Sequence, residues 1–164
     1  MSNFKDSPHF EIHDDYYTPR SAWENIASAI PKDKIIWEAC MLGAKLSKSP
    51  QYLKELTPPP KGVVAYTFMD CLDEEPLEWD MIITNIPFDI KLKVPILERF
   101  ISLDKPFILI MNSLNTFSKY FHKIFSGKEK DLQIITPSSK INFDKLEGGV
   151  LKPTNKCSFY CVYV

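Results

Sequence analysis

The feature that most constrains the fold is a set of short runs with apolar centres, separated by segments of helical periodicity. The clearest of these runs are 35–37, 79–84 and 107–111. Apolar runs of this length are typical of strands that are buried on both faces of a parallel sheet. Because parallel neighbours need a crossover between them, usually a helix, the alternation predicts an α/β fold with a mostly parallel central sheet.

The helix boundaries follow from residues that commonly start or stop helices. Thr18-Pro19 and Ser49-Pro50 each place a capping residue before a proline, and Ser126-Gly127 closes a later apolar repeat. We predict helices over residues 19–30, 49–57, 92–101 and 114–125. We predict strands over residues 35–37, 62–68, 79–84, 107–111, 132–136 and 157–164, with a Gly148-Gly149 loop between two strands.

Length and charge limit the organisation of the chain. Its 164 residues suffice for one domain with a core, so we expect an N-terminal arm over 1–17 and a domain over 18–164. With 20 basic and 21 acidic side chains the net charge is -1, so any contact with nucleic acid must be local. No apolar run approaches the roughly 20 residues of a membrane helix, which predicts a soluble, intracellular protein without a membrane partner.

The cysteines and histidines do not have the spacing of a metal site. No Cys-x-x-Cys pair is present, and the three histidines are scattered along the chain. We therefore expect no metal, and we expect reduced thiols in apolar surroundings. The four cysteines are Cys40, Cys71, Cys157 and Cys161.

Candidate ligand segments follow three predicted strands, at 38–44, 70–73 and 85–88. Ligands of open parallel sheets bind beyond the carboxyl ends of the strands. In the third segment, the amide oxygen of Asn85 and a backbone carbonyl can accept both hydrogens of an exocyclic amine. Phe88 can stack on a flipped base, which is worth about 1–3 kcal/mol. The structural alternative is a strand-to-helix turn in which Asn85 is a local cap.

The segment 80–88, Asp-Met-Ile-Ile-Thr-Asn-Ile-Pro-Phe, resembles the catalytic motif of amino-methyltransferases that act on adenine. Ile86 stands where that family has its first proline, and the rRNA adenine dimethyltransferases have a similar turn. The similarity extends from Tyr16 to Val164, especially to small proteins of phages and large DNA viruses. It implies a Rossmann-like class I methyltransferase fold, with helices on both faces and an antiparallel C-terminal strand. It also implies a catalytic role for Asn85, Ile86, Pro87 and Phe88.

The same resemblance implies S-adenosylmethionine as the cofactor. Residues 38–44 carry one glycine where the family has two, so Leu42 and Ala44 narrow the space for the cofactor. Glu38 has the alternative of a solvated strand end, and Asp70 that of an exposed charged loop. By resemblance, the cofactor-binding residues are Tyr17, Thr18, Glu38, Cys40, Gly43, Asp70 and Cys71.

The expected function is methylation of the adenine amine in DNA, with RNA as the second choice. One alternative is an inactive protein of this fold with a structural or nucleic-acid-binding role in a larger assembly, and another is a protein glutamine methyltransferase. The length leaves no room for an inserted recognition domain, so a homodimer or a partner subunit is expected to supply target recognition. A viral protein of this kind would work in the host cytoplasm or nucleus. Four lysines are candidates to guide the phosphate backbone, or simply to keep the surface solvated: Lys45, Lys48, Lys91 and Lys93.

Overall fold

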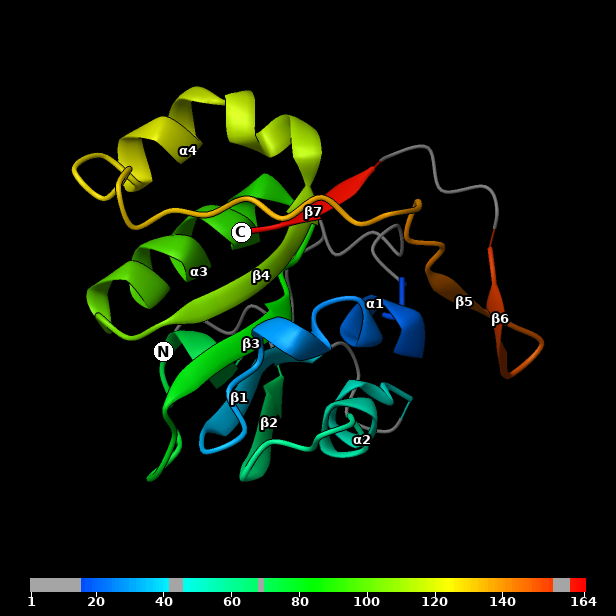
Figure 1. Ribbon diagram of the computed structural model, residues 1–164. Helices are drawn as coiled ribbons and strands as arrows, with labels where there is room; N and C mark the ends of the chain where they lie inside the picture. Colours follow the sequence, from blue (N-terminus) through cyan, green and yellow to red (C-terminus); the bar gives the residue numbers. More distant parts are fainter. Residues whose placement is uncertain (1–15, 42–45, 68–69, 155–159) are drawn as a thin grey trace.

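A five-stranded sheet forms the centre of the protein in the computed structural model, which describes residues 16–41, 46–67, 70–154 and 160–164 (Figure 1). The strand order is β2-β1-β3-β4-β7, in which the first four strands are parallel and β7 is antiparallel to β4. The α/β class, the mostly parallel sheet and the antiparallel C-terminal strand are therefore confirmed. The strands are β1 (Ile35–Met41), β2 (Gly62–Thr67), β3 (Met81–Asn85), β4 (Phe107–Asn112) and β7 (Cys161–Tyr163).

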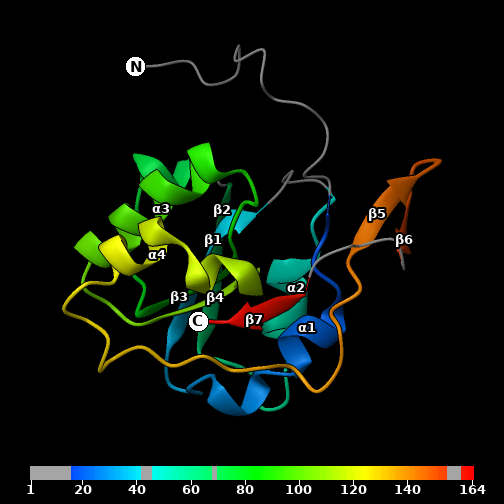
Figure 2. The ribbon, with the colours of Figure 1, turned by 90° about the horizontal axis from the view of Figure 1, so that it is seen from above.

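Alternate residues of the central strands build two separate cores, one on each face of the sheet. Trp37, Ile82 and Leu109 face a cluster that includes side chains of α3 (Ile90–Ser102) and α4 (Lys119–Ile124). Their neighbours Ile36, Ile83 and Ile110 face a cluster with side chains of α1 (Arg20–Glu24) and α2 (Ser49–Lys54). Seen from above, α3 and α4 lie on one side of the sheet and α1 and α2 on the other (Figure 2). Helices on both faces explain why these strands are apolar at nearly every position.

Two predicted helices are interrupted. The helix predicted over 19–30 consists of α1 and a separate 3₁₀ turn, η2 (Ala27–Ala29). The helix predicted over 114–125 consists of the 3₁₀ helix η4 (Ser113–Phe117) and α4, divided at Ser118. Ser118 is extended, with φ -83° and ψ 148°, and its hydroxyl accepts from the N–H of Phe121 to begin α4. Serine and asparagine side chains favour such caps over helix interiors, so the helix breaks at Ser118 although the apolar spacing continues across it.

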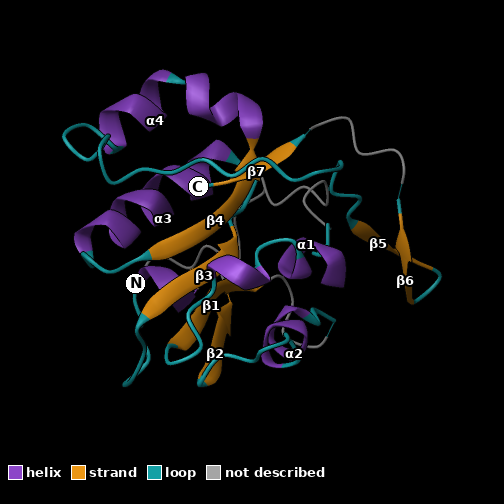
Figure 3. Ribbon diagram, in the orientation of Figure 1, coloured by secondary structure: helices purple, strands orange, loops and turns teal. Residues whose placement is uncertain are grey.

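The carboxyl-terminal third also departs from the prediction. Residues 132–136 form no strand, because only Ile135 pairs, through an isolated bridge to Tyr163. Pro137 follows this segment and has no N–H with which to extend the pairing. The predicted Gly-Gly loop is confirmed, since β5 (Asp144–Glu147) and β6 (Val150–Pro153) form a hairpin with positive φ at Gly148 and Gly149. This hairpin stands out from the body of the domain (Figure 3).

The last residues of the predicted N-terminal arm pack onto the domain. Tyr17 is 7% exposed and exchanges two backbone hydrogen bonds with Asp144, the first residue of β5. Tyr16 lies edge-on against the rings of Phe88 and Phe143. Within the described parts of the chain, no helix is long and apolar enough to cross a membrane.

Candidate functional site

The candidate site lies where the chain changes direction across the sheet. From β1 the chain moves outward to β2, and it then returns to form β3 and β4 on the other side of β1. Open α/β sheets bind ligands at such a switch point, beyond the carboxyl ends of the two strands that flank it. Here those ends carry Glu38 and Cys40 on β1, and Thr84 and Asn85 on β3.

Thr84 joins the two strands through its side chain. Its hydroxyl donates to Glu38 Oε1 at 2.6 Å and accepts from the backbone N–H of Cys40 at 2.9 Å. Backbone pairing between β1 and β3 covers only Ile36 and Trp37 on β1. Beyond Trp37, where the two strands diverge, the hydroxyl of Thr84 links them instead. The divergence creates a polar position inside an otherwise apolar sheet.

Glu38 is a buried carboxylic acid at this position. It is 2% exposed, and burial raises its pKa from the ordinary value of 4.5 to about 7, although the hydrogen bonds from Thr84 and the Cys40 backbone act in the opposite direction. Its second oxygen, Oε2, has no hydrogen-bond partner among the described residues. Strongly perturbed carboxyl groups are common at functional sites, and the unmatched oxygen leaves an acceptor for a ligand donor.

Asn85 ends β3 with a second unmatched acceptor. Its Oδ1 is buried and has no hydrogen-bond partner in the part of the chain that the structure describes. Ile86 follows, fully buried, and its N–H donates to Ile110 O at 3.2 Å. A proline at position 86 could not make that hydrogen bond, which gives a physical reason for isoleucine in this turn.

The ring of Phe88 is held by neighbouring aromatic side chains. Tyr16 and Phe143 meet it edge-on, with centroid distances of 6.2 and 5.9 Å. Lys93, on the first turns of α3, donates from Nζ to the carbonyl oxygen of Phe88 at 3.0 Å. Because Lys93 is 3% exposed, the hypothesis that it guides a phosphate backbone is wrong, and it fixes the turn instead.

The predicted cofactor residues of β1 and of the segment after β2 come together. Cys40 Sγ lies 4.0 Å from Sγ of Cys71 in η3 (Asp70–Leu72), and both thiols are buried. Burial and the neighbouring Cys71 raise the pKa of the Cys40 thiol well above its ordinary value. Asp70 is exposed, and its carboxylate accepts from the Thr67 hydroxyl at 2.6 Å.

The remaining predicted cofactor residues occupy other positions. Tyr17 and Thr18 are 7% and 8% exposed, and they follow Tyr16, which contacts Phe88. They therefore lie on the Phe88 side of the site, whereas Asp70 and Cys71 follow the carboxyl end of β2. Gly43 lies outside the described residues.

Thr84 was missed from the sequence as a residue of the site, and Lys93 was given a different role there. Thr84 is the polar end of the run Met81–Thr84, and a hydroxyl in a strand buried on both faces needs a partner. Lys93 stands three, four and seven residues before Ile96, Leu97 and Phe100, all of which are buried on one face of α3. A cation on that face must find an acceptor inside the protein, so the helical period carried a usable signal.

A cavity of about 510 Å³ lies at the opposite end of the sheet. It is bounded by Met81 and Phe107 at the amino ends of β3 and β4, and by Phe100, Ile101 and residues 104–106 at the end of α3. It is therefore separate from the polar edge formed by Glu38, Thr84 and Asn85.

No known family model matches the chain, and no curated protein matches it. The candidate site is accordingly defined by its geometry alone: two unmatched buried acceptors at the switch point of a parallel sheet.

Proposed function

We propose that the protein transfers a methyl group from S-adenosylmethionine to the exocyclic amine of adenine in DNA, with RNA as the second substrate class. The observation that carries the proposal is the unmatched Oδ1 of Asn85 at the carboxyl end of β3. The strand order, with four parallel strands and an antiparallel last strand, supports a Rossmann-like methyltransferase domain.

An unmatched buried acceptor is costly for the folded protein. Desolvation without a hydrogen bond costs about 1–3 kcal/mol, so a buried acceptor of this kind needs a partner from water, an ion or a ligand. An exocyclic amine offers two N–H donors in one plane. Asn85 Oδ1 and the carbonyl oxygen of Ile86 can accept one each, while Phe88 provides an aromatic surface for the base.

The chain's own groups provide positioning and charge stabilisation in this mechanism. S-adenosylmethionine would supply an electrophilic methyl group on a sulfonium, whose sulfur would leave as a neutral thioether. The two acceptors would draw the amine hydrogens toward the turn and so turn the nitrogen lone pair away from the ring system, ready to accept the methyl group. They also stabilise the positive charge that develops on the nitrogen, which then loses a proton to water. No covalent bond to the protein is needed, so most of the catalysis comes from orientation.

The unmatched acceptor of Glu38 suits the polar part of the cofactor. Its unmatched Oε2 can accept from a hydroxyl or an ammonium group, and ionisation above the pKa of about 7 strengthens that bond. Asp70 presents a second, exposed carboxylate beyond β2. Tyr17 and Thr18 would cover the site from the Phe88 side.

Calorimetric titration with S-adenosylmethionine, and separately with its demethylated product, tests the cofactor half of the proposal. At about pH 8, where Glu38 is largely ionised, wild type should bind saturably, and Asn85→Ala should bind equally well. Glu38→Gln should bind roughly 10- to 150-fold more weakly, because a hydrogen bond to a charged group is worth about 1.5–3 kcal/mol. Absence of binding to wild type would overturn the proposal and favour a protein of this fold without activity.

A further inference from the structure

Aromatic and lysine side chains gather beside the candidate site, on and around the β5–β6 hairpin. The set consists of Tyr16, Lys140, Lys145, Lys152 and Tyr160, here called the hairpin surface. Lys145 Nζ lies 4.4 Å from the ring centroid of Tyr16, and Lys140 Nζ lies 5.1 Å from that of Tyr160. Two of the three lysines therefore each lie over an aromatic ring.

The hairpin register places two lysines directly opposite each other. Lys145 pairs with Lys152, so both side chains project from the same face, which they share with Glu147 and Val150. Like charges at opposed positions destabilise a two-stranded ribbon. One carboxylate on a face with two lysines leaves a local positive charge that a polyanion would compensate.

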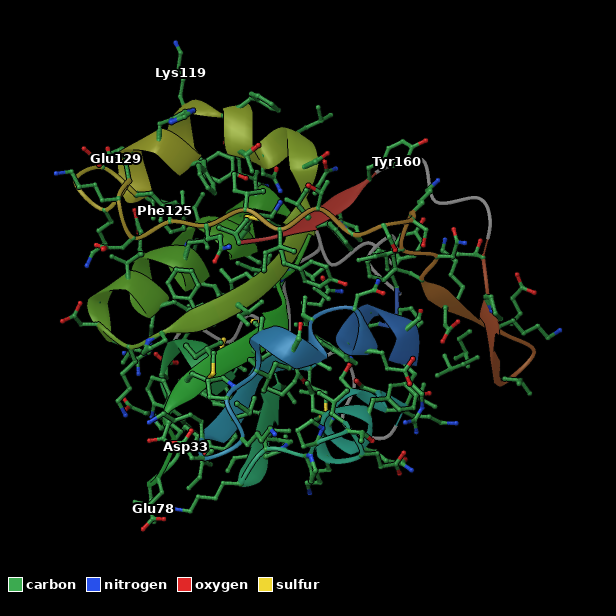
Figure 4. All side chains as sticks on the ribbon, in the orientation of Figure 1. Asp33, Glu78, Lys119, Phe125, Glu129 and Tyr160 are labelled. Carbon is green, nitrogen blue, oxygen red and sulfur yellow. The ribbon has the colours of Figure 1, made fainter. Side chains whose placement is uncertain are left out.

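Exposed apolar side chains continue this surface along the carboxyl edge of β4. Tyr160 is 64% exposed, and its carbonyl oxygen accepts from the N–H of Ser113, the residue that follows β4. Within η4, Leu114 and Phe117 are 72% and 80% exposed. Figure 4 shows Tyr160 at the start of β7 and Lys119 pointing away from α4. Between Lys105 and Lys128 the chain has no acidic residue, so Leu114 and Phe117 lie in a segment whose charged groups are basic.

The hairpin surface is directly connected to the proposed catalytic turn. The ring of Tyr16, which lies under the ammonium group of Lys145, also meets the ring of Phe88 edge-on, with a centroid distance of 6.2 Å. Asp144, at the base of the hairpin, pairs with Tyr17. Burial raises the pKa of the Asp144 carboxyl, and the charge of the nearby Lys48 acts in the opposite direction. At the far end of the sheet edge, the segment after β2 is acidic, with carboxylates at 70, 73, 74 and 75. Residues 140–153 thus carry three lysines against two carboxylates, whereas residues 70–75 carry four carboxylates and no cation.

We infer that the hairpin surface binds a single-stranded segment of nucleic acid next to the target base, an inference that rests on the proposed function and names its substrate class. Lysines opposite each other on a narrow ribbon suit successive phosphates, and exposed rings suit stacking. Stacking on Tyr160 or Phe117 requires the face of a base, which a paired duplex does not offer. A nearly neutral chain can bind a polyanion only where its cations are gathered locally, as they are here.

Titration of a fluorescent single-stranded DNA oligonucleotide, without cofactor and over a range of salt concentrations, tests this inference. Lys152→Glu should weaken binding and reduce the slope of log K against log salt by about 0.7, the value for one lost contact to a single strand. This substitution places opposite charges across the ribbon, so it should leave thermal stability unchanged or raised. Lys61→Glu is the control, because it makes the same charge change at an exposed position before β2.

The aromatic part of the surface is tested in the same titration. Tyr160→Ala should weaken binding by roughly 5- to 150-fold, the effect of one lost stacking contact, whereas Tyr160→Phe should bind like wild type. A duplex of the same sequence should bind more weakly than the single strand. Equal binding by wild type, Lys152→Glu and Tyr160→Ala, or no binding by wild type, would overturn the inference.

The outcome is distinguishable from failure of the proposed function. If S-adenosylmethionine binds but the hairpin variants bind DNA normally, the hairpin surface is wrong and the methyltransferase proposal stands. If the variants lose DNA binding but no cofactor binds, the surface stands and the chain is a nucleic-acid-binding protein of this fold.

Discussion

Replacement of Glu38 by glutamine should stabilise the protein at alkaline pH while weakening cofactor binding. Glutamine keeps an oxygen to accept from Thr84, which donates to Glu38 Oε1 at 2.6 Å in the native protein. It removes the group whose ionisation in a buried position is unfavourable. A residue that lowers the stability of the folded protein in this way is expected where function requires the charge.

The magnitude follows from the pKa of about 7 in the folded protein against an ordinary value of 4.5. Because the folded-state pKa is the higher one, the folded protein holds a proton that the unfolded chain has released between these two values. The contribution of Glu38 to the free energy of unfolding is thus complete below pH 4.5 and is lost as the pH rises to about 7. At about 1.4 kcal/mol per pH unit, the loss is about 3 kcal/mol.

Urea denaturation from about pH 4.5 to about pH 8 measures this effect. The free energy of unfolding of wild type, relative to Glu38→Gln, should fall by about 3 kcal/mol across that range. Glu24→Gln, at an exposed position of α1, is the control and should follow the wild-type profile. Parallel profiles for wild type and Glu38→Gln would refute the argument that Glu38 is buried and protonated near neutral pH.

Three further substitutions test the contacts that hold the site and the core. Thr84→Val should lower the free energy of unfolding by about 2–3 kcal/mol, since it leaves the Cys40 N–H and Glu38 without their hydrogen-bond partner. Thr67→Val, which removes an exposed hydrogen bond, should lower it by less than about 1 kcal/mol, and urea denaturation compares the two variants. Tyr163→Phe removes a buried 2.6 Å bond from the Tyr163 hydroxyl to Ala22 O and should cost about 1–2 kcal/mol in the same assay, and an unchanged midpoint would contradict that bond. Lys93→Met keeps an apolar stem but loses the bond to Phe88 O, so kcat should fall while S-adenosylmethionine binding is retained; an unchanged kcat would show that the bond does not position the turn.

The central sheet could be predicted from the sequence because both faces of its strands are buried. Burial on both faces makes β3 and β4 apolar up to the polar residues at their carboxyl ends, which is typical of buried parallel strands. The helices were harder to delimit. Ser118 breaks the segment before α4 by capping a backbone N–H, a local competition that the apolar spacing does not record. Residues 132–136 have strand-like composition, but a single bridge to Tyr163 is all that β7 offers them.

The candidate site was predictable as far as its position at the strand ends, but not in its internal contacts. Asn85 stands out because it directly ends an apolar strand, and Glu38 because an acid follows the apolar run 35–37, although β1 continues to Met41. The hydroxyl of Thr84 between two diverging strands and the bond from Lys93 to Phe88 O depend on tertiary geometry. From the sequence, Ile86 is only a replacement for the first proline of the motif that it resembles. The structure gives the reason, because the N–H of Ile86 donates to Ile110 O and a proline has no N–H.

The most direct measurement is the amount of N6-methyladenine formed in a single-stranded DNA oligonucleotide incubated with S-adenosylmethionine and analysed as nucleosides by mass spectrometry. Wild type should form it, and Asn85→Ala should not. Asn112→Ala is the matched control, because Asn112 also ends a strand at this edge but its side chain already accepts from Leu114 N at 3.0 Å, so activity should be retained. No N6-methyladenine with wild type, or equal amounts with wild type and Asn85→Ala, would contradict the account.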